Sequence, residues 1–388
     1  GWTARSATVG GDLTWVDSAQ RDGGWGSDVD AVRPDYDGAW VGGIVPALLG
    51  RAGAGWLPEP LADAEGTVLL VLDGLGWRML EVHRERLLTV AGMTGGPIRT
   101  VVPSTTAAGL TSISTGVPPA THGIVGYRIR AGGQPLNVLR WPSENGPDPQ
   151  AVQPVRPFLG REIPVVTRAE FRGSGFTRAH LRGTTLIGWK TTSALVTHVR
   201  GLAGPKRRFA YAYYDGIDKV AHEFGLRNAF LPAELSAVDR LVADLLDALP
   251  DTWALLVTAD HGQVHVGADA VVALDAVAAY VAAYAGEGRF RTLHARTGKA
   301  RDLHAACADT YGDRAWVLSR DELFDGGWLG PGGSLAVRGR VGDVILAARE
   351  PVMFVDPGLA KEASMRSHHG SMTADEMIVP LLAARGRA

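Results

Sequence analysis

Four short apolar segments of this chain are each followed directly by acidic, hydroxyl or imidazole side chains. The stretches are TVLLVLD, IRTVVPSTT, FAYAYYDGIDKVAH and WALLVTADHGQ. Their apolar parts are predicted to be β-strands, at residues 67–72, 98–102, 209–214 and 253–258. Parallel strands place their carboxyl ends at one edge of a sheet, where sites form in open α/β folds. We therefore expect these polar residues to converge.

The acids and histidines in these stretches could bind a cation. Each Asp could instead cap a helix and each His could make structural hydrogen bonds, but several unneutralised carboxylates in one place repel one another. Asp218 and His222 are one helical turn apart, so they can hold the same ion. Of His368 and His369 we expect only one to bind metal, because adjacent residues of an extended chain point opposite ways. Oxygen and imidazole donors without thiolate suit zinc, with manganese or iron as alternatives.

Three hydroxyl residues, Ser104, Thr105 and Thr106, stand directly before a predicted helix. Any of them could simply be the N-cap of that helix. Beside two divalent ions, however, a hydroxyl at a helix amino terminus has what phosphoryl transfer requires. The ions lower its pKa and neutralise phosphate oxygens, and the helix amides favour a phosphoryl group. The Asp and His residues of these segments supply enough donors for two ions and no more.

The composition allows a large core and excludes some functions. The 388 residues are 46% hydrophobic and carry a formal net charge of -2, so we expect no specific nucleic-acid binding. The apolar runs are far shorter than the roughly 20 residues that cross a bilayer, so we expect no membrane span. The single cysteine, Cys307, excludes an internal disulfide. Together with the lack of a signal-peptide pattern in the first eleven residues, it favours a cytoplasmic location.

Short apolar runs alternate with helical patterns along the chain, which predicts an α/β fold: a mostly parallel central sheet with helices on both faces. Residues 344–347 and 352–355 are further predicted strands. From Pro232 to Leu249, leucine and valine recur at steps of three and four residues. This spacing predicts an amphipathic helix that Pro250 ends.

Two regions depart from this alternation. Residues 1–34, rich in Gly, Asp and Ser, are predicted to be an irregular arm before a main domain over residues 35–388. Residues 127–190 hold ten Lys or Arg against four Asp or Glu and many prolines. This composition predicts a basic inserted cap rather than a continuation of the sheet, and a cap beside the site would attract anions. A solvated basic face is the alternative.

Five motifs in chain order resemble those of the alkaline phosphatase superfamily and, within it, the nucleotide pyrophosphatase/phosphodiesterase branch. They are VLDGLG, PSTTAAGLTSISTGVPPATHGIVGY, YYDGIDKVAHEFG, TADHG and HHGSMTADEMIVPLL. From Asp73 to about Leu382, the resemblance covers most of the chain. It implies an alkaline phosphatase-like catalytic domain with two divalent ions, most often zinc.

The resemblance also implies a role for each matched residue. Thr106 would be the nucleophile and would contact one ion directly. The ligands of the two ions would be Asp218, His222 and His369, and Asp73, Asp260 and His261. Asp215 would be an ordinary loop acid, and His122 a structural residue beneath the nucleophile helix. Gly109 stands where the branch commonly has an Asn that binds a phosphate oxygen, so the Ala107 amide, the ions or an arginine would replace that donor.

The expected function is therefore metal-dependent hydrolysis of a small anionic phosphate ester through a covalent phospho-threonine. Phosphodiesters or nucleotide-like anhydrides are the preferred substrates. A phosphomonoesterase or a phosphoglycerate mutase-like phosphotransferase is an alternative within the superfamily. A sulfatase is disfavoured, because AAGL follows Thr106 where that branch has x-Pro-x-Arg. A non-catalytic protein that binds metal or anions is the alternative of another class, and the complete ligand set argues against it.

Overall fold

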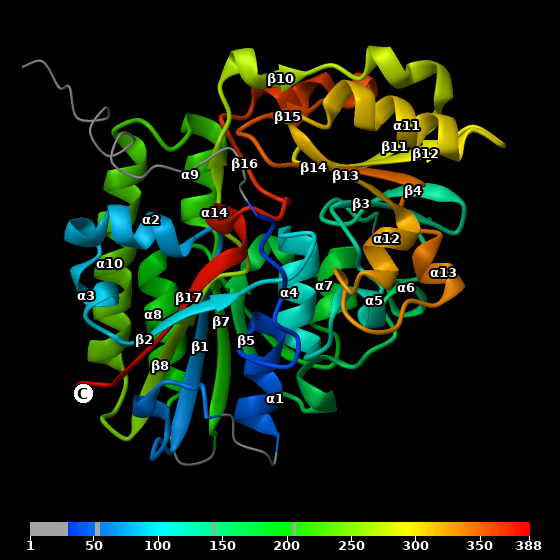
Figure 1. The fold of residues 1–388 in the computed structure, drawn as a ribbon. Helices are drawn as coiled ribbons and strands as arrows, with labels where there is room; N and C mark the ends of the chain where they lie inside the picture. The colour runs from blue at the N-terminus through cyan, green and yellow to red at the C-terminus, as the bar shows by residue number, and fades with distance from the viewer. Residues whose placement is uncertain (1–29, 51–54, 143–144, 205–206) are drawn as a thin grey trace, which may run out of the picture. The chain divides into compact units, whose positions relative to one another are not determined.

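The computed structural model describes residues 30–50, 55–142, 145–204 and 207–388. Residues 31–388 form one unit, organised by a seven-stranded sheet (Figure 1). In spatial order the strands are β2 (Thr94–Arg99), β17 (Ile378–Arg385), β8 (Trp253–Thr258), β1 (Gly66–Leu72), β7 (Phe209–Tyr214), β5 (Pro164–Arg168) and β6 (Thr185–Trp189).

Five neighbouring strands, β8, β1, β7, β5 and β6, run parallel, and β17 is antiparallel to both β8 and β2. Every residue of β1, β7 and β8 is buried, as expected for parallel strands covered on both faces. The carboxyl ends of β1, β7, β8 and β2 consequently lie at the same edge of the sheet. The predicted α/β class is confirmed, and β7 and β8 have their predicted bounds.

Helices cover both faces of the sheet (Figure 1). One group packs around α10, and the other packs around α4. The first group is α3 (Leu88–Ala91), α8 (Thr192–Leu202), α9 (Gly216–Phe224) and α10 (Phe230–Ala248). The second is α1 (Ile44–Leu49), α4 (Thr106–Thr115), α5 (Pro119–His122) and α7 (Gly175–His180). The amphipathic helix predicted up to Pro250 is confirmed as α10, whose apolar stripe is buried.

A second, antiparallel sheet has its own apolar core, which includes Cys307. Its strands are β11 (Val281–Glu287), β12 (Phe290–Ala295), β14 (Val344–Ala348) and β13 (Ala315–Ser319), with α11 (Ala300–Tyr311) packed against it. Two-stranded pairs complete the strands: β3 (Arg128–Ala131) with β4 (Gln134–Asn137), β9 (Val264–His265) with β16 (Ser367–His368), and β10 (Val271–Val272) with β15 (Met353–Phe354).

The remaining helices are short. The α-helices are α2 (Trp77–Val82), α6 (Pro149–Val152), α12 (Arg320–Asp325), α13 (Leu335–Arg338) and α14 (Ala374–Met377). The 3-10 helices are η1 (Val41–Gly43), η2 (Glu59–Leu61), η3 (Arg84–Arg86), η4 (Pro157–Gly160), η5 (Ala169–Phe171), η6 (Ala268–Ala270), η7 (Asp275–Tyr280) and η8 (Pro357–Ser364). None of the helices in the described ranges combines the length and the hydropathy of a membrane-spanning segment.

The strand predicted at residues 98–102 is misplaced, because β2 covers Thr94–Arg99. β2 is an edge strand, and its register with β17 ends where Arg99 faces Ile378. The next residue, Thr100, has other partners: its amide donates to the Met377 carbonyl at the end of α14, and its hydroxyl donates to the Asp260 carbonyl. The strand predicted at 352–355 is likewise reduced to the two residues of β15.

The cap predicted over residues 127–190 requires correction, because β5 and β6 within it belong to the central sheet. The basic side chains mislead here, since many of them bind the protein itself. Arg128 pairs with Asp356, Arg168 with Asp215, and Arg182 donates to backbone carbonyls. Of the predicted arm, residues 1–29 lie outside the described residues, and residues 30–34 form no helix or strand.

Candidate active site

The polar ends of β1, β7 and β8 meet the amino terminus of α4 at one point, the His261 imidazole. Its Nε2 lies 3.0 Å from the Thr106 hydroxyl oxygen. The same nitrogen is 3.4 Å from Oδ1 of Asp73 and 3.7 Å from Oδ2 of Asp260. His261 and both aspartates are almost completely buried. A hydroxyl, two carboxylates and an imidazole therefore share one enclosed position.

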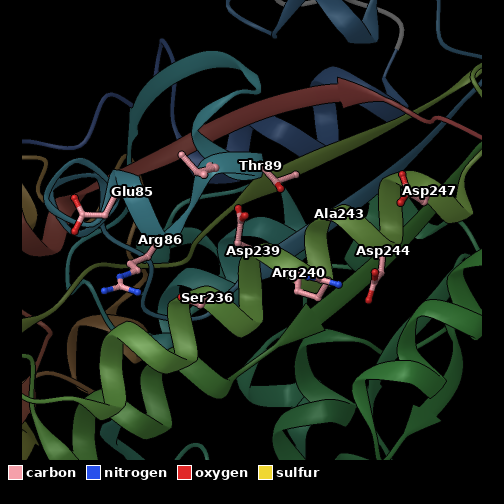
Figure 2. A pocket seen from close by; sticks show the side chains of 10 residues that line it. Glu85, Arg86, Thr89, Ser236, Asp239, Arg240, Ala243, Asp244 and Asp247 are labelled. Carbon is pink, nitrogen blue, oxygen red and sulfur yellow. The ribbon is translucent and has the colours of Figure 1, made fainter.

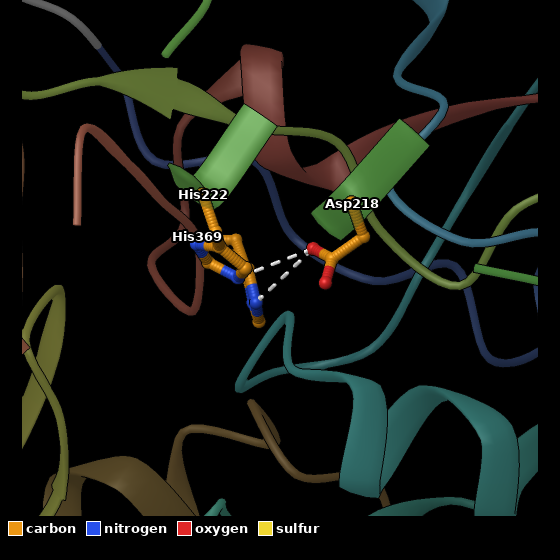
Figure 3. A group of neighbouring side chains, drawn as sticks. All are labelled: Asp218, His222 and His369. Atoms are coloured by element: carbon orange, nitrogen blue, oxygen red, sulfur yellow. Dashed lines mark ion pairs between the residues drawn. The ribbon is translucent and has the colours of Figure 1, made fainter. Parts of the chain in front are cut away.

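A second group of donors adjoins this position (Figure 3). Oδ1 of Asp218 lies 3.2 Å from Nε2 of His222 and 3.9 Å from Nε2 of His369, and the three side chains point toward one another. The His369 ring stacks on the His261 ring with centroids 3.6 Å apart, which joins the two groups. The structure thus brings together all seven residues singled out from the sequence.

Asp218 belongs to two sets of ligand atoms that lie within 4.8 Å of one another: one with His222 and His369, the other with Asp73 and His261. The resemblance had assigned Asp260, not Asp218, to the second set. Asp260 does lie beside His261, but its Oδ1 is occupied by the backbone N–H groups of Gly74 and His261. Only Oδ2 of Asp260 is left to face a ligand.

The loop that carries His369 is bonded to the loop that precedes Thr106. Nδ1 of His369 donates to the Ser104 carbonyl at 3.0 Å, and the Gly370 amide donates to the Ser104 hydroxyl oxygen. That hydroxyl in turn donates to the Ser371 carbonyl at 2.6 Å. Ser104 therefore joins two loops, and of the three hydroxyls in PSTT it is Thr106 that faces His261.

Helix α4 approaches the end of β8 closely because residue 109 is glycine. A Cβ at Gly109 would lie 2.8 Å from the Asp260 carbonyl oxygen and 2.9 Å from the Asp260 Cβ. An Asn side chain at this position would collide with the segment that carries Asp260. The close packing of α4 against Asp260 therefore leaves no room for an Asn side chain at residue 109.

Burial and crowding both act on the three aspartates. The pKa of Asp73 is raised well above its usual value by burial and by repulsion from Asp260 and Asp218. Burial and Asp218 likewise raise the pKa of Asp260. Burial also opposes ionisation of Asp218, but His222, His369 and His261 together outweigh it and lower the Asp218 pKa. The pKa of His222 in turn rises to about 9, because Asp218 overcomes the effect of its burial.

These observations test whether divalent cations suit the site. Oδ1 of Asp73 and Oδ2 of Asp260 are buried and have no hydrogen-bond partner among the described residues. Unpartnered buried oxygens are costly, and both face the His261 nitrogen. Burial strongly lowers the pKa of His369, which keeps its imidazole neutral and able to donate a lone pair. Oxygen and imidazole donors arranged in this way fit zinc or a similar divalent ion.

Three residues near the site escaped the sequence analysis. The Tyr213 hydroxyl donates to Oδ2 of Asp73. Nε2 of Gln263 donates to Oδ1 of Asp218 at 2.7 Å. Oε2 of Glu287, at the end of β11, lies 3.8 Å from Nδ1 of His369. The position of Gln263 directly after ADHG was a usable signal, but nothing in the sequence placed β11 beside the site.

Other polar residues of the motifs have structural roles. Asp215 forms ion pairs with Arg168 and Lys219. His122, fully buried, accepts from the Ile124 amide and shares a 2.9 Å hydrogen bond with the Ser112 hydroxyl of α4. His122 thus lies beneath α4, as the resemblance implied, whereas Asp215 is the buried N-cap residue of α9 rather than an ordinary loop acid. His368 and His265 lie on the paired strands β16 and β9 and belong to neither set of ligand atoms.

A surface hollow of about 540 Å³ lies elsewhere, between η3, α3 and α10 (Figure 2). Its lining mixes charges of both signs, including Glu85, Asp239 and Arg240, and none of the seven site residues lines it. The hollow is therefore separate from the candidate site.

The central sheet and the clustered Asp, His and Thr side chains define a protein of the alkaline phosphatase superfamily. The profile of the type I phosphodiesterase/nucleotide pyrophosphatase family matches residues 67–372, and the chain belongs to this family. Membership supports phosphodiester hydrolase activity, and members of this family generally use two divalent metals. No curated protein sequence matches the chain.

Solved structures share the fold. Murine ectonucleotide pyrophosphatase/phosphodiesterase 5 is 15% identical with a TM-score of 0.64, over 83% of this chain and 88% of that one. The human protein of the same name is 14% identical with a TM-score of 0.65, over 83% and 88%. An inactive threonine-to-alanine variant of the murine protein in complex with AMP is 14% identical with a TM-score of 0.62, over 82% and 87%.

Proposed function

We propose that this protein is a two-metal phosphodiesterase of the nucleotide pyrophosphatase type that works through a covalent phospho-threonine at Thr106. The single observation that carries the proposal is the position of the Thr106 hydroxyl, 3.0 Å from Nε2 of His261. Two buried carboxylate oxygens without partners face the same nitrogen. A hydroxyl beside an enclosed set of metal donors is suited to nucleophilic attack on phosphorus.

The donors divide between two cation positions. Asp218, His222 and His369 would hold one ion, and Asp73, Asp260 and His261 would hold the other, with Asp218 close enough to contact both. When bound, the two ions would activate the Thr106 hydroxyl, neutralise phosphate oxygens and stabilise the leaving oxygen. Zinc is our preferred identity for the donor set, because it combines carboxylate and imidazole ligands.

The chain's own residues supply the remaining chemistry. The Thr106 oxygen bonds to phosphorus while the bond from phosphorus to the leaving oxygen breaks, and water then hydrolyses the phospho-threonine and restores the hydroxyl. Among the described residues, no side chain caps α4 at Thr105. The amides of the first turn, including that of Ala107, therefore remain available to bind a phosphoryl oxygen. They would replace the donor that Gly109 does not provide.

The proposed substrates are phosphodiesters or nucleotide-like anhydrides. Family membership supports a diester, and the murine relative has been solved in complex with AMP. Comparing bis(p-nitrophenyl) phosphate with p-nitrophenyl phosphate tests this choice. Faster turnover of the diester is expected, whereas a preference for the monoester would overturn the substrate class. Bound metal without turnover of either would indicate a non-catalytic binding protein.

Replacement of the nucleophile is the direct test of the mechanism. Thr106→Ala is expected to lower kcat by at least about a thousandfold, because no other hydroxyl occupies its position. Metal content and melting temperature should stay close to those of the wild type, since the Asp and His ligands are intact. Thr105→Ala is the matched control and should retain activity. Near-normal turnover by Thr106→Ala would refute the assignment of the nucleophile.

A further inference from the structure

Gln263 lies where three ligand-bearing segments meet. Its side chain is buried, with an exposed fraction of 5%. Its Nε2 donates to Oδ1 of Asp218 on α9 at 2.7 Å, and its Oε1 accepts from the Ser367 hydroxyl in the segment that carries His369. The third segment is the turn after Asp73: a Cβ at Gly74 would lie 2.6 Å from Nε2 of Gln263. One amide thus touches all three segments.

The hydrogen bonds define which way this amide points. A carboxylate accepts only, so the NH₂ group must face Asp218, and the amide oxygen then faces the Ser367 hydroxyl. Ser367 also accepts, through its backbone carbonyl, the Nδ1–H of His222 at 2.7 Å. This leaves Nε2 of His222 directed at Asp218. Gln263 and Ser367 together orient both α9 ligands.

A neutral donor is the appropriate partner for a carboxylate that binds a cation. Lys or Arg would also hold Asp218, but its positive charge would repel the ion that Asp218 is meant to bind. A glutamine amide donates a hydrogen bond without that cost. Hydrogen bonds of this kind from outside the ligand set orient ligands and tune metal affinity.

We propose that Gln263 is a positioning residue of the metal centre, which fixes the orientation of Asp218 for the cations. This inference rests on the proposed function, because it assumes that Asp218 is a metal ligand. It extends that function by assigning a role to a residue outside the ligand set. Loss of the amide removes one hydrogen bond that holds Asp218 and one contact between α9 and the segment of Ser367, while the bond from His222 to the Ser367 carbonyl remains.

Gln263→Met tests the proposal, since methionine has a similar length and no N–H donor. Zn²⁺ affinity, measured by competition with a chelator, is expected to fall about 10- to 100-fold. The visible absorption of the Co²⁺-loaded protein should change, and kcat should fall more than KM rises. Gln153→Met is the matched control: Gln153 is also buried and bonds Ala179 and Val155. It should lower the melting temperature without changing Zn²⁺ affinity or the Co²⁺ spectrum.

The outcomes separate this inference from the proposed function. A wild-type protein that binds no Zn²⁺ would refute the metal site itself. A wild-type protein that binds two ions, with Gln263→Met unchanged in affinity and Co²⁺ spectrum, would overturn only the role of Gln263. If Gln263→Met does not fold, Ser367→Ala decides, because it removes the hydroxyl that orients the amide and keeps the amide itself. A loss of Zn²⁺ affinity in Ser367→Ala that is smaller than the loss expected for Gln263→Met supports the proposal, and unchanged Zn²⁺ affinity refutes it.

Discussion

Asp215 and Asp218 are three residues apart at the start of α9 and are held in opposite ways. Asp215 lies 2.5 Å from Nε of Arg168 and 2.8 Å from Nζ of Lys219, so cations of the chain neutralise it. Asp218 receives a hydrogen bond from Gln263 and contacts histidines, and no Lys or Arg of the described residues pairs with it. Among the described residues, the charged partners of Asp218 are thus imidazoles, which can bind a metal in place of a proton, whereas those of Asp215 are Arg and Lys.

The same difference separates the site from the rest of the molecule. Asp73 is bonded by the Tyr213 hydroxyl and Asp260 by backbone amides, all of them neutral donors. Buried acids elsewhere have cationic partners: Asp356 pairs with Arg128, and Glu376 accepts two hydrogen bonds from Arg289. Among the buried acids of the described residues, Asp73 and Asp260 are thus the two without an Arg or Lys partner. An external cation is what this arrangement lacks.

The largest expected effect comes from replacing one carboxylate with an amide in the site, at Asp73, and one outside it, at Asp215. Asp73→Asn should lower activity at least about a hundredfold, because a metal ligand is lost. In chelator-treated protein it should raise stability by about 1 to 2 kcal/mol. Folding raises the pKa of Asp73, so the wild-type carboxylate, charged in the unfolded chain at neutral pH, costs free energy to bury. Asn keeps an acceptor for Tyr213.

Asp215→Asn is the matched variant for this experiment. Its free energy of unfolding should fall by about 1 to 3 kcal/mol, because Arg168 and Lys219 lose their partner. Its metal content should be unchanged. Chemical denaturation of both variants, with and without Zn²⁺, measures the effects. Should Asp73→Asn be destabilised without metal to the same extent as Asp215→Asn, the contrast between the two regions is wrong.

A smaller effect is expected from Gly109, which tests whether the position of Asp260 matters as well as its charge. Gly109→Ala should lower the free energy of unfolding by about 1 to 3 kcal/mol and should lower kcat, because the new Cβ pushes α4 away from Asp260. The matched control is Gly201→Ala in α8, where nothing lies within 4 Å of an added Cβ. Gly201→Ala should raise the free energy of unfolding by about 0.5 to 1 kcal/mol. Equal activity in both variants would show that the close approach of α4 is not needed.

The convergence of the residues after β1, β7 and β8 was predictable because these strands have a clear signal. β1, β7 and β8 are fully buried and rich in apolar residues, and Asp73, Asp215 and the segment Ala259–His261 follow them directly, so topology alone brought these polar residues to one edge. The donors that hold these ligands were not predictable. Tyr213 reaches Asp73 from the neighbouring strand, where the register sets Tyr213 beside Val71. Such a contact depends on strand pairing, which a single sequence does not display.

The missed parts of the fold have weaker local patterns. β2 contains two glycines and Pro97, and β17 contains Pro380, residues that normally argue against a strand. Pro97 faces Pro380 in the register, so pairing with β17 outweighs local propensity. β5 and β6 were missed because proline and arginine around them resemble the composition of a loop. There Arg172 and Arg182 donate to backbone carbonyls, and Arg168 pairs with Asp215.

The smallest effect is expected from the exposed arginines of residues 127–190. If the positive charge of these arginines attracted the substrate to the site, the site acids would not be free of cationic influence, and the comparison with the arginine-paired acids would fail. Arg140 is exposed, so water and salt screen its charge beyond about 8 Å. Arg140→Gln should therefore raise KM for an anionic diester by less than about twofold at physiological salt.

Arg128→Gln should leave KM unchanged and lower the melting temperature, because Arg128 pairs with the buried Asp356. Steady-state kinetics at two salt concentrations measure both, and a severalfold rise in KM for either variant would place part of the substrate's attraction outside the metal centre.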